Sequence, residues 1–317
     1  MNSKTILKII ILAAVFVGGF AAANFHIDFS SSKIPSDSNK KGEYKFINPV
    51  VLADIDKHFI VNFQPLRDEI RSIAEKYPQK TYVYFSYLNN GSWIGINERE
   101  NFAAASLAKV PLSMSIYKAV EDKKLELGQF YTIEELDLNS GFGELYKNSK
   151  DRVFSIEELI KIMLEQSDNT ALNGLLTVFS RIGINNPYDE VYQAFGWVLD
   201  MDKSVNANEI NLKTLSNMFL SLYNANFISL ENSEKILEYL SNTPFEDKIV
   251  AGVPENIVVS HKIGISGGNS TFSDCGIIYA PQRHYLLCLG SNGGEESKAN
   301  KFMEEISEAT YKFVINN

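Results

Sequence analysis

Two residues at helical spacing are the first candidates for chemistry in this sequence. Ser106 and Lys109 stand three positions apart, so on a helix their side chains lie on one face, one above the other. A serine hydroxyl is a poor nucleophile near neutral pH and needs a neighbouring base to take its proton. Lysine can be that base only when it is uncharged, and burial lowers the pKa of an ammonium group. Residues 107–120 are apolar nearly all round a helix, which predicts that Lys109 is buried.

The spacing alone is weak evidence, because it recurs elsewhere in the chain. Its other occurrences are Ser30/Lys33, Ser38/Lys41 and Ser115/Lys118. By itself, Ser106 would be interpreted as the N-cap of a helix, a position that serine favours.

Two further segments change that interpretation. Ser167-Asp168-Asn169 occurs once, in a polar break between two apolar helical patterns, where its residue types could also cap a helix. Lys262-Ile263-Gly264 ends a predicted strand, where a lysine alone would usually be solvated. Each segment has an ordinary structural explanation, but three such explanations would be needed at once.

Taken together and in this order, the three segments resemble the motifs Ser-x-x-Lys, Ser-Asp-Asn and Lys-Thr-Gly. These are the motifs of class A β-lactamases and penicillin-binding proteins. The stretches FAAASLAKVPL and QSDNTALNGLL around the first two motifs are also similar to that family. The resemblance covers residues 65–316 and predicts a serine hydrolase.

The resemblance implies a role for each matching side chain. Ser106 would attack a carbonyl carbon and become acylated, while Lys109 accepts its proton. Ser167 would relay a proton to the departing nitrogen. Asn169 would hold Lys109 and a substrate amide, and Lys262 would attract a substrate carboxylate and keep Lys109 neutral.

The backbone would complete the site. The resemblance implies an oxyanion hole made by the N–H groups of Ser106 and Ile265, with Gly264 beside it in the substrate-binding strand. Asp168 would be structural and would tie its loop to the surroundings. No cofactor and no metal ion are implied.

Several family features are missing from the sequence. Ile263 stands where the family usually has Thr or Ser, so a hydroxyl that contacts the substrate carboxylate is absent. No arginine lies between Lys262 and Tyr279, where many class A enzymes supply a guanidinium. No Glu-x-x-Leu-Asn loop follows Ser167, and the same pattern at Glu135–Asn139 precedes it. These departures argue against efficient antibiotic hydrolysis.

Two functions therefore remain open. The first is a serine acyl hydrolase acting on a β-lactam or a D-alanyl peptidoglycan-type amide, including D-Ala-D-Ala carboxypeptidase-like activity. The second is a penicillin-binding or receptor-like protein of the cell envelope, or a pseudoenzyme, with slow or no turnover. His261 and His284 are candidates for another base, but packing roles are favoured for both.

The elements that would position these residues can be predicted from periodicity and turn signals. Asn89-Asn90-Gly91 between two β-rich runs predicts a hairpin. The predicted order is a helix at 65–77, strands at 81–88 and 92–97, mainly helices at 106–240, three strands within 256–290, and a helix at 295–313. This order predicts an α/β fold of the α+β type, in which terminal helices flank an antiparallel five-stranded sheet. A helical subdomain, about 105–240, would form a cleft with the sheet.

The N-terminus indicates export. Lys4 and Lys8 precede the apolar run 9–23, which ends in the small residues Ala21-Ala22-Ala23. Residues 1–25 are therefore expected to be a signal peptide or an uncleaved membrane anchor. Residues 26–45 are polar and predict a flexible tether, and 46–317 would form the hydrolase domain outside the cytoplasmic membrane, in the periplasm or beyond the cell.

Composition limits the partners. The net charge of −9 argues against a nucleic-acid partner, and a small or neutral ligand fits better. The resemblance implies that this ligand is a small β-lactam or a peptidoglycan peptide, and a monomer is expected. Only the N-terminal segment would contact a membrane. Cys275 and Cys288 could face each other across a hairpin, but two buried thiols are the favoured interpretation.

Overall fold

The computed structural model describes residues 44–48, 61–147, 152–196 and 209–317. Residues Tyr44–Asn317 form one compact unit. The predicted export segment and all but the last two residues of the predicted tether lie outside the described residues. In the described ranges, no helix is both long and apolar enough to cross a membrane.

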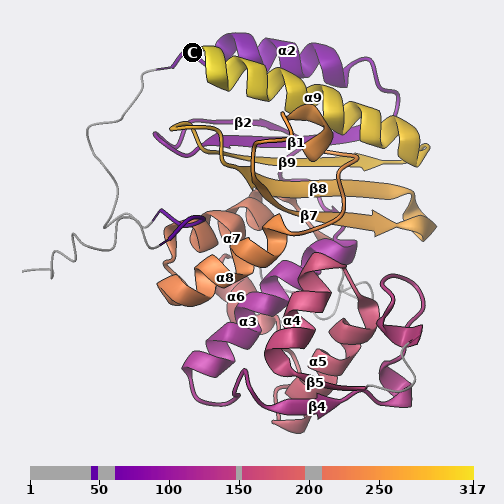
Figure 1. Cartoon of the computed structure of the whole chain (residues 1–317). Coiled ribbons are helices and arrows are strands. Elements are labelled where there is room, and N and C mark those ends of the chain that lie inside the picture. The colour runs from indigo at the N-terminus through magenta and orange to yellow at the C-terminus, as the bar shows by residue number, and fades with distance from the viewer. Residues whose placement is uncertain (1–43, 49–60, 148–151, 197–208) are drawn as a thin grey trace, which may run out of the picture. The chain divides into compact units, whose positions relative to one another are not determined.

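A five-stranded antiparallel sheet forms the centre of the unit, in the order β2-β1-β9-β8-β7 (Figure 1). Its strands are β1 (Lys80–Tyr87), β2 (Trp93–Ile96), β7 (Val259–Ser266), β8 (Thr271–Ile278) and β9 (Tyr285–Asn292). The predicted fold class is confirmed. β7 is an edge strand of this sheet, so its outer edge can contact the segments that carry the candidate site.

The hairpin between β1 and β2 forms at the predicted turn. Gly91 has φ of 73°, a left-handed conformation that glycine adopts without a steric penalty. Its N–H donates to the carbonyl oxygen of Tyr87 at 2.8 Å.

Helices cover both faces of the sheet (Figure 1). α2 (Gln64–Ala74) and α9 (Glu296–Asn316) pack against each other and cover one face. α7 (Leu212–Asn224) and α8 (Leu230–Ser241) cover the other. Every residue of β8 and all but the last residue of β9 are consequently buried, and the buried set includes polar side chains as well as apolar ones.

The remaining α-helices described build the helical part that the sequence predicted between the strands. They are α3 (Lys109–Glu121), α4 (Ile156–Glu165), α5 (Asn169–Arg181) and α6 (Asp189–Ala194). α3 is the central one, and ten of its side chains are buried, including Lys109. Its lack of a polar face agrees with contacts to α4, α6 and α8.

Two short ribbons were not predicted. β3 (Phe102–Ala103) pairs with β6 (Glu209–Ile210), and β4 (Phe130–Thr132) pairs with β5 (Val153–Ser155). Strands of two or three residues are too short to show an alternating pattern, so periodicity cannot reveal them.

The cysteines correct an expectation. Cys275 and Cys288 are register neighbours on β8 and β9, and the structure joins them in a disulfide. The favoured interpretation as two separate thiols is therefore wrong. Directly opposed residues in an antiparallel pair share one face of the sheet, but the register that opposes them is not visible in the sequence.

Candidate active site

Ser106 lies in a short 3-10 turn, Ala105–Ala108, that leads directly into α3. Side chains three residues apart nearly eclipse one another in a 3-10 turn. Accordingly, the Nζ atom of Lys109 lies 3.0 Å from the Oγ atom of Ser106. Ala105 has φ of 46°, an uncommon conformation for a residue with a Cβ atom. Backbone strain of this kind is typical of functional sites.

Lys109 is almost completely buried, with 1% of its surface exposed. Its Nζ atom donates to the carbonyl oxygen of Ser167 at 2.7 Å and to Oδ1 of Asn169 at 2.7 Å. Burial lowers the pKa of Lys109 to about 8, although the carboxylate charge of Asp168 acts in the opposite direction. Roughly a tenth of this amine is therefore uncharged at pH 7, far more than of a solvated lysine, and the uncharged form is the one that can accept a proton.

Lys262 reaches the same cluster from β7 and is fully buried. Its Nζ atom lies 2.8 Å from Oγ of Ser167 and 5.6 Å from the centre of the Phe245 ring. Burial and the charge of Lys109 lower the pKa of Lys262 well below its usual value. Lys109 also approaches Oγ of Ser167, at 3.4 Å. The hydroxyl thus lies between two amines, and protonation of one disfavours protonation of the other.

Asp168 holds the loop that carries Ser167 and Asn169. One of its carboxylate oxygens accepts from the backbone N–H of Ala171 at 2.9 Å and caps α5. The other accepts from the N–H of Leu145 at 2.9 Å and ties down the preceding loop. Capping and site formation are therefore not alternatives, because Asp168 caps the helix while its two neighbours face Lys109.

Gly264 permits the close approach of β7 to the turn that carries Ser106. A Cβ atom on Gly264 would lie 2.9 Å from the carbonyl oxygen of Ala104 and 3.0 Å from Cγ of Leu107. Only glycine fits there without movement of the backbone. Ile265 follows Gly264 on the same strand. The oxyanion hole expected from the N–H groups of Ile265 and Ser106 stays a prediction.

We expect Gly264→Ala to reduce the free energy of unfolding by about 1–3 kcal/mol, the usual cost of overpacking. The added methyl group would lie 2.5 Å from Oγ of Ser273 and 2.9 Å from the backbone carbonyl oxygen of Ala104, and this backbone cannot rotate aside as a side chain can. Urea denaturation would measure the change. Gly267→Ala is the matched control, because a Cβ atom there meets nothing within 4 Å. Equal stability of the two variants would contradict the prediction.

Ile263 does not face the cluster. Side chains alternate along a strand, so Ile263 points away from the Lys262 side, where it is 3% exposed and opposite Asp274. The histidines are also elsewhere: His261 contacts Asp274, and Nδ1 of His284 lies 2.8 Å from the hydroxyl of Tyr223. These contacts agree with the packing roles expected for both histidines.

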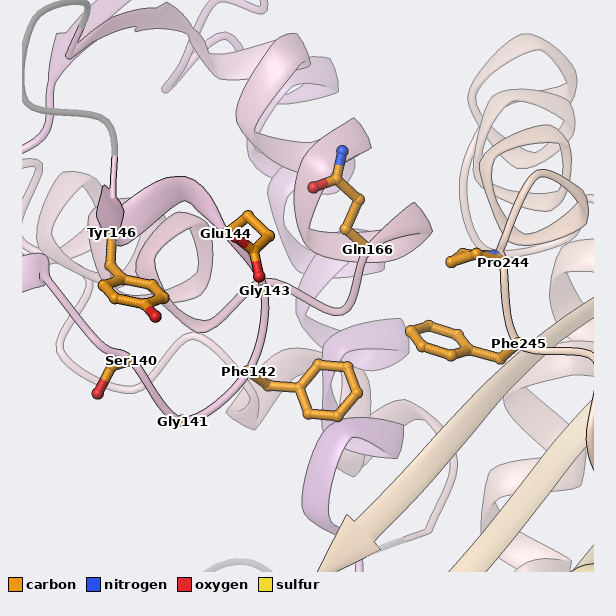
Figure 2. Close-up of a pocket in the computed structure, with 9 residues that line it drawn as sticks. All are labelled: Ser140, Gly141, Phe142, Gly143, Glu144, Tyr146, Gln166, Pro244 and Phe245. Atoms are coloured by element: carbon orange, nitrogen blue, oxygen red, sulfur yellow. The ribbon is translucent and has the colours of Figure 1, made fainter.

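Phe142 and Phe245 near the cluster were not found by sequence reasoning, and Asn139 was named only as the end of the pattern Glu135–Asn139, which precedes Ser167. Oδ1 of Asn139 lies 3.4 Å from Nδ2 of Asn169. The rings of Phe142 and Phe245 lie 5.7 Å apart, and they point toward each other from the two sides of a pocket (Figure 2). No motif marks Phe142 and Phe245, because tertiary contacts alone bring them to Asn169 and Lys262.

The pocket has a volume of about 490 Å³, and Figure 2 shows the residues that line it. It is lined by Ser140, Gly141, Phe142, Gly143, Glu144, Tyr146, Gln166, Pro244 and Phe245. Gln166 directly precedes Ser167, and the carbonyl oxygen of Phe142 accepts from the N–H of Asn169 at 3.0 Å. The pocket therefore borders the loop that carries the second motif.

Comparison with known proteins extends these observations. Residues 65–314 match the model of the Beta-lactamase enzyme family. The chain is 26% identical over 267 residues to an imipenem-hydrolyzing beta-lactamase of Enterobacter cloacae, covering 79% of this chain and 88% of that protein. It is 23% identical over 260 residues to beta-lactamase SME-1 of Serratia marcescens, covering 76% and 85%.

Solved structures show the same fold. PBP-A superposes with a TM-score of 0.71 at 18% identity, covering 86% of this chain and 100% of that chain. A beta-lactamase from Sphaerobacter thermophilus superposes with a TM-score of 0.70 at 19% identity, covering 81% and 99%. Because the family model spans all three motifs and most of the chain, the protein belongs to the beta-lactamase enzyme family.

Proposed function

We propose that this protein is an exported serine acyl hydrolase that a β-lactam or a D-alanyl peptidoglycan-type amide acylates at Ser106. The main support for this proposal is the 3.0 Å contact between Oγ of Ser106 and the buried amine of Lys109. Family membership supports hydrolysis of amide bonds. The L158E mutant of PBP-A, whose fold is similar to this one, has been solved as an acyl-enzyme complex with penicillin G.

In the proposed reaction, uncharged Lys109 takes the proton of Ser106 as Oγ attacks the carbonyl carbon. Negative charge then develops on the carbonyl oxygen, where the N–H groups of Ser106 and Ile265 would stabilise it. The proton returns through Ser167: Lys109 gives it to Oγ of Ser167, which passes its own to the departing nitrogen. The short distances from Ser167 to both lysines support this relay.

The proposed substrate would be positioned from three sides. Asn169 would bind its amide, and its own contact with Lys109 at 2.7 Å would keep it in place. The strand around Gly264 would bind the opposite edge of the substrate. Lys262 in its protonated form, which an uncharged Lys109 favours, would provide positive potential for a carboxylate. The hydroxyl usual at position 263 is replaced by a buried isoleucine.

A second candidate keeps the acylation but not the turnover. It is a penicillin-binding or receptor-like protein of the cell envelope that stays acylated. It is favoured by the absence of a Glu-x-x-Leu-Asn loop after Ser167 and by the apolar side chain of Ile263.

Intact mass spectrometry after exposure to penicillin G tests both. We expect the wild type to gain the mass of one penicillin and Ser106→Ala to gain none. An adduct that disappears with time indicates hydrolysis, and a persistent adduct favours the second candidate. An unlabelled wild type, or a labelled Ser106→Ala variant, would contradict the proposed nucleophile.

A further inference from the structure

A buried histidine and carboxylate lie behind the cluster and have no part in the proposed reaction. His261 is 2% exposed and Asp274 is fully buried, and Nδ1 of His261 lies 2.8 Å from Oδ1 of Asp274. His261 precedes Lys262 on β7, so it points to the opposite face of the sheet. A buried carboxylate is costly unless its oxygens are hydrogen-bonded, and the second oxygen accepts from the N–H of Ile249 at 3.2 Å.

The other hydrogen bonds of the pair are made with the segment that follows α8. Nε2 of His261 lies 2.8 Å from Oγ1 of Thr243. Thr243 and Ile249 are therefore both fastened to the pair, one at each end of the segment 243–249. We call this segment the clamped loop.

The clamped loop carries Phe245 to the active site. The centre of the Phe245 ring lies 5.6 Å from Nζ of Lys262. The same ring faces the ring of Phe142 (Figure 2). Pro244 and Phe245 form the side of the pocket that faces the loop containing Phe142. The pair is therefore linked to Lys262 in two ways. His261 is the neighbour of Lys262 in β7, and the clamped loop places Phe245 against Lys262.

We propose that the His261–Asp274 pair is a positioning pair for the active site, because it fixes the clamped loop so that Phe245 stays against Lys262. This inference depends on the acylation of Ser106 proposed above. Within the part of the chain that the structure describes, the pair hydrogen-bonds to Thr243 and Ile249 and not to Ser106, so both residues act through Phe245. A loop that is not held samples many conformations, and ordering it costs free energy when substrate binds. Loss of the clamp should therefore weaken substrate binding more than the chemical step.

Thr243→Val tests the clamp, with Thr243→Ser as its control. Valine keeps the shape of threonine but removes the hydroxyl that contacts His261, and serine retains it. Hydrogen exchange of residues 243–250 reports on the loop without any reaction. Acylation by penicillin G, measured over a range of concentrations, separates the dissociation constant of the first complex from the acylation rate constant.

In Thr243→Val we expect faster exchange of residues 243–250 and unchanged exchange in β9 and α9. The dissociation constant should rise roughly tenfold, which corresponds to the usual net value of one hydrogen bond, and the rate constant should change much less. Thr243→Ser should resemble the wild type. Adding Phe245→Ala to Thr243→Val should weaken binding no further than Phe245→Ala alone, because both changes act through the same ring.

The outcomes separate the two proposals. Unchanged exchange in Thr243→Val overturns the clamp, and so does faster exchange with unaltered penicillin binding. A fall in the acylation rate constant alone would also overturn it. If the wild type is never acylated, the proposed function fails, and the exchange result alone then decides whether the pair holds the loop.

Discussion

Lys109→Met is expected to reduce the acylation rate of Ser106 by about a thousandfold, within the range that general bases contribute. Methionine has a similar length but cannot accept a proton, so the Ser106 hydroxyl would lose the partner at 3.0 Å that activates it. Time-resolved mass spectrometry with penicillin G would measure the rate.

The same substitution leaves the carbonyl of Ser167 and Oδ1 of Asn169 without their donor. We therefore expect a parallel loss of about 1–3 kcal/mol in the free energy of unfolding, which thermal denaturation would detect. Lys118→Met is the matched control: Lys118 lies on the same helix but binds the exposed Asp122. A folded Lys109→Met variant that is acylated at the wild-type rate would exclude Lys109 as the base.

Much of the fold can be predicted from the sequence because its main elements are long. The sheet strands β7, β8 and β9 have eight residues each, so each carries enough β-rich sequence to be recognised. The two ribbons, with strands of two or three residues, carry no such signal. The disulfide between Cys275 and Cys288 depends on register, which is settled by pairing across the sheet rather than by local sequence.

The candidate site, like the fold, could be predicted only in part from the sequence. The motifs around Ser106, Ser167 and Lys262 can be recognised because their spacing is local, and the structure brings these residues together. The ring of Phe245 and the hydroxyl of Thr243 gain their positions only through distant contacts. Gly264 was expected to bind substrate, and the structure adds a different reason for glycine there, which is the close approach of β7 to the Ser106 turn.

The acylation rate is expected to depend strongly on pH, with a midpoint near the pKa of Lys109, which burial lowers to about 8. Only the uncharged amine accepts the proton of Ser106, so the rate rises with pH and levels off above the pKa. Below it, the uncharged fraction falls about tenfold for each pH unit, so the rate at pH 6 should be about one hundredth of the plateau. A solvated lysine with the ordinary pKa of 10.5 would instead give a rate that is still rising at pH 9.

The variant Asp168→Asn separates Lys109 from other titrating groups. The charge of Asp168 raises the pKa of Lys109, so its removal should move the midpoint to lower pH. Asparagine can still cap α5 through its Oδ1 atom, whereas its amide group cannot accept from Leu145 as the second carboxylate oxygen does. The plateau rate is therefore expected to fall while the midpoint moves down, and rate and midpoint should be fitted separately. A midpoint that does not move, or that moves to higher pH, would mean that the titrating base is a group other than Lys109.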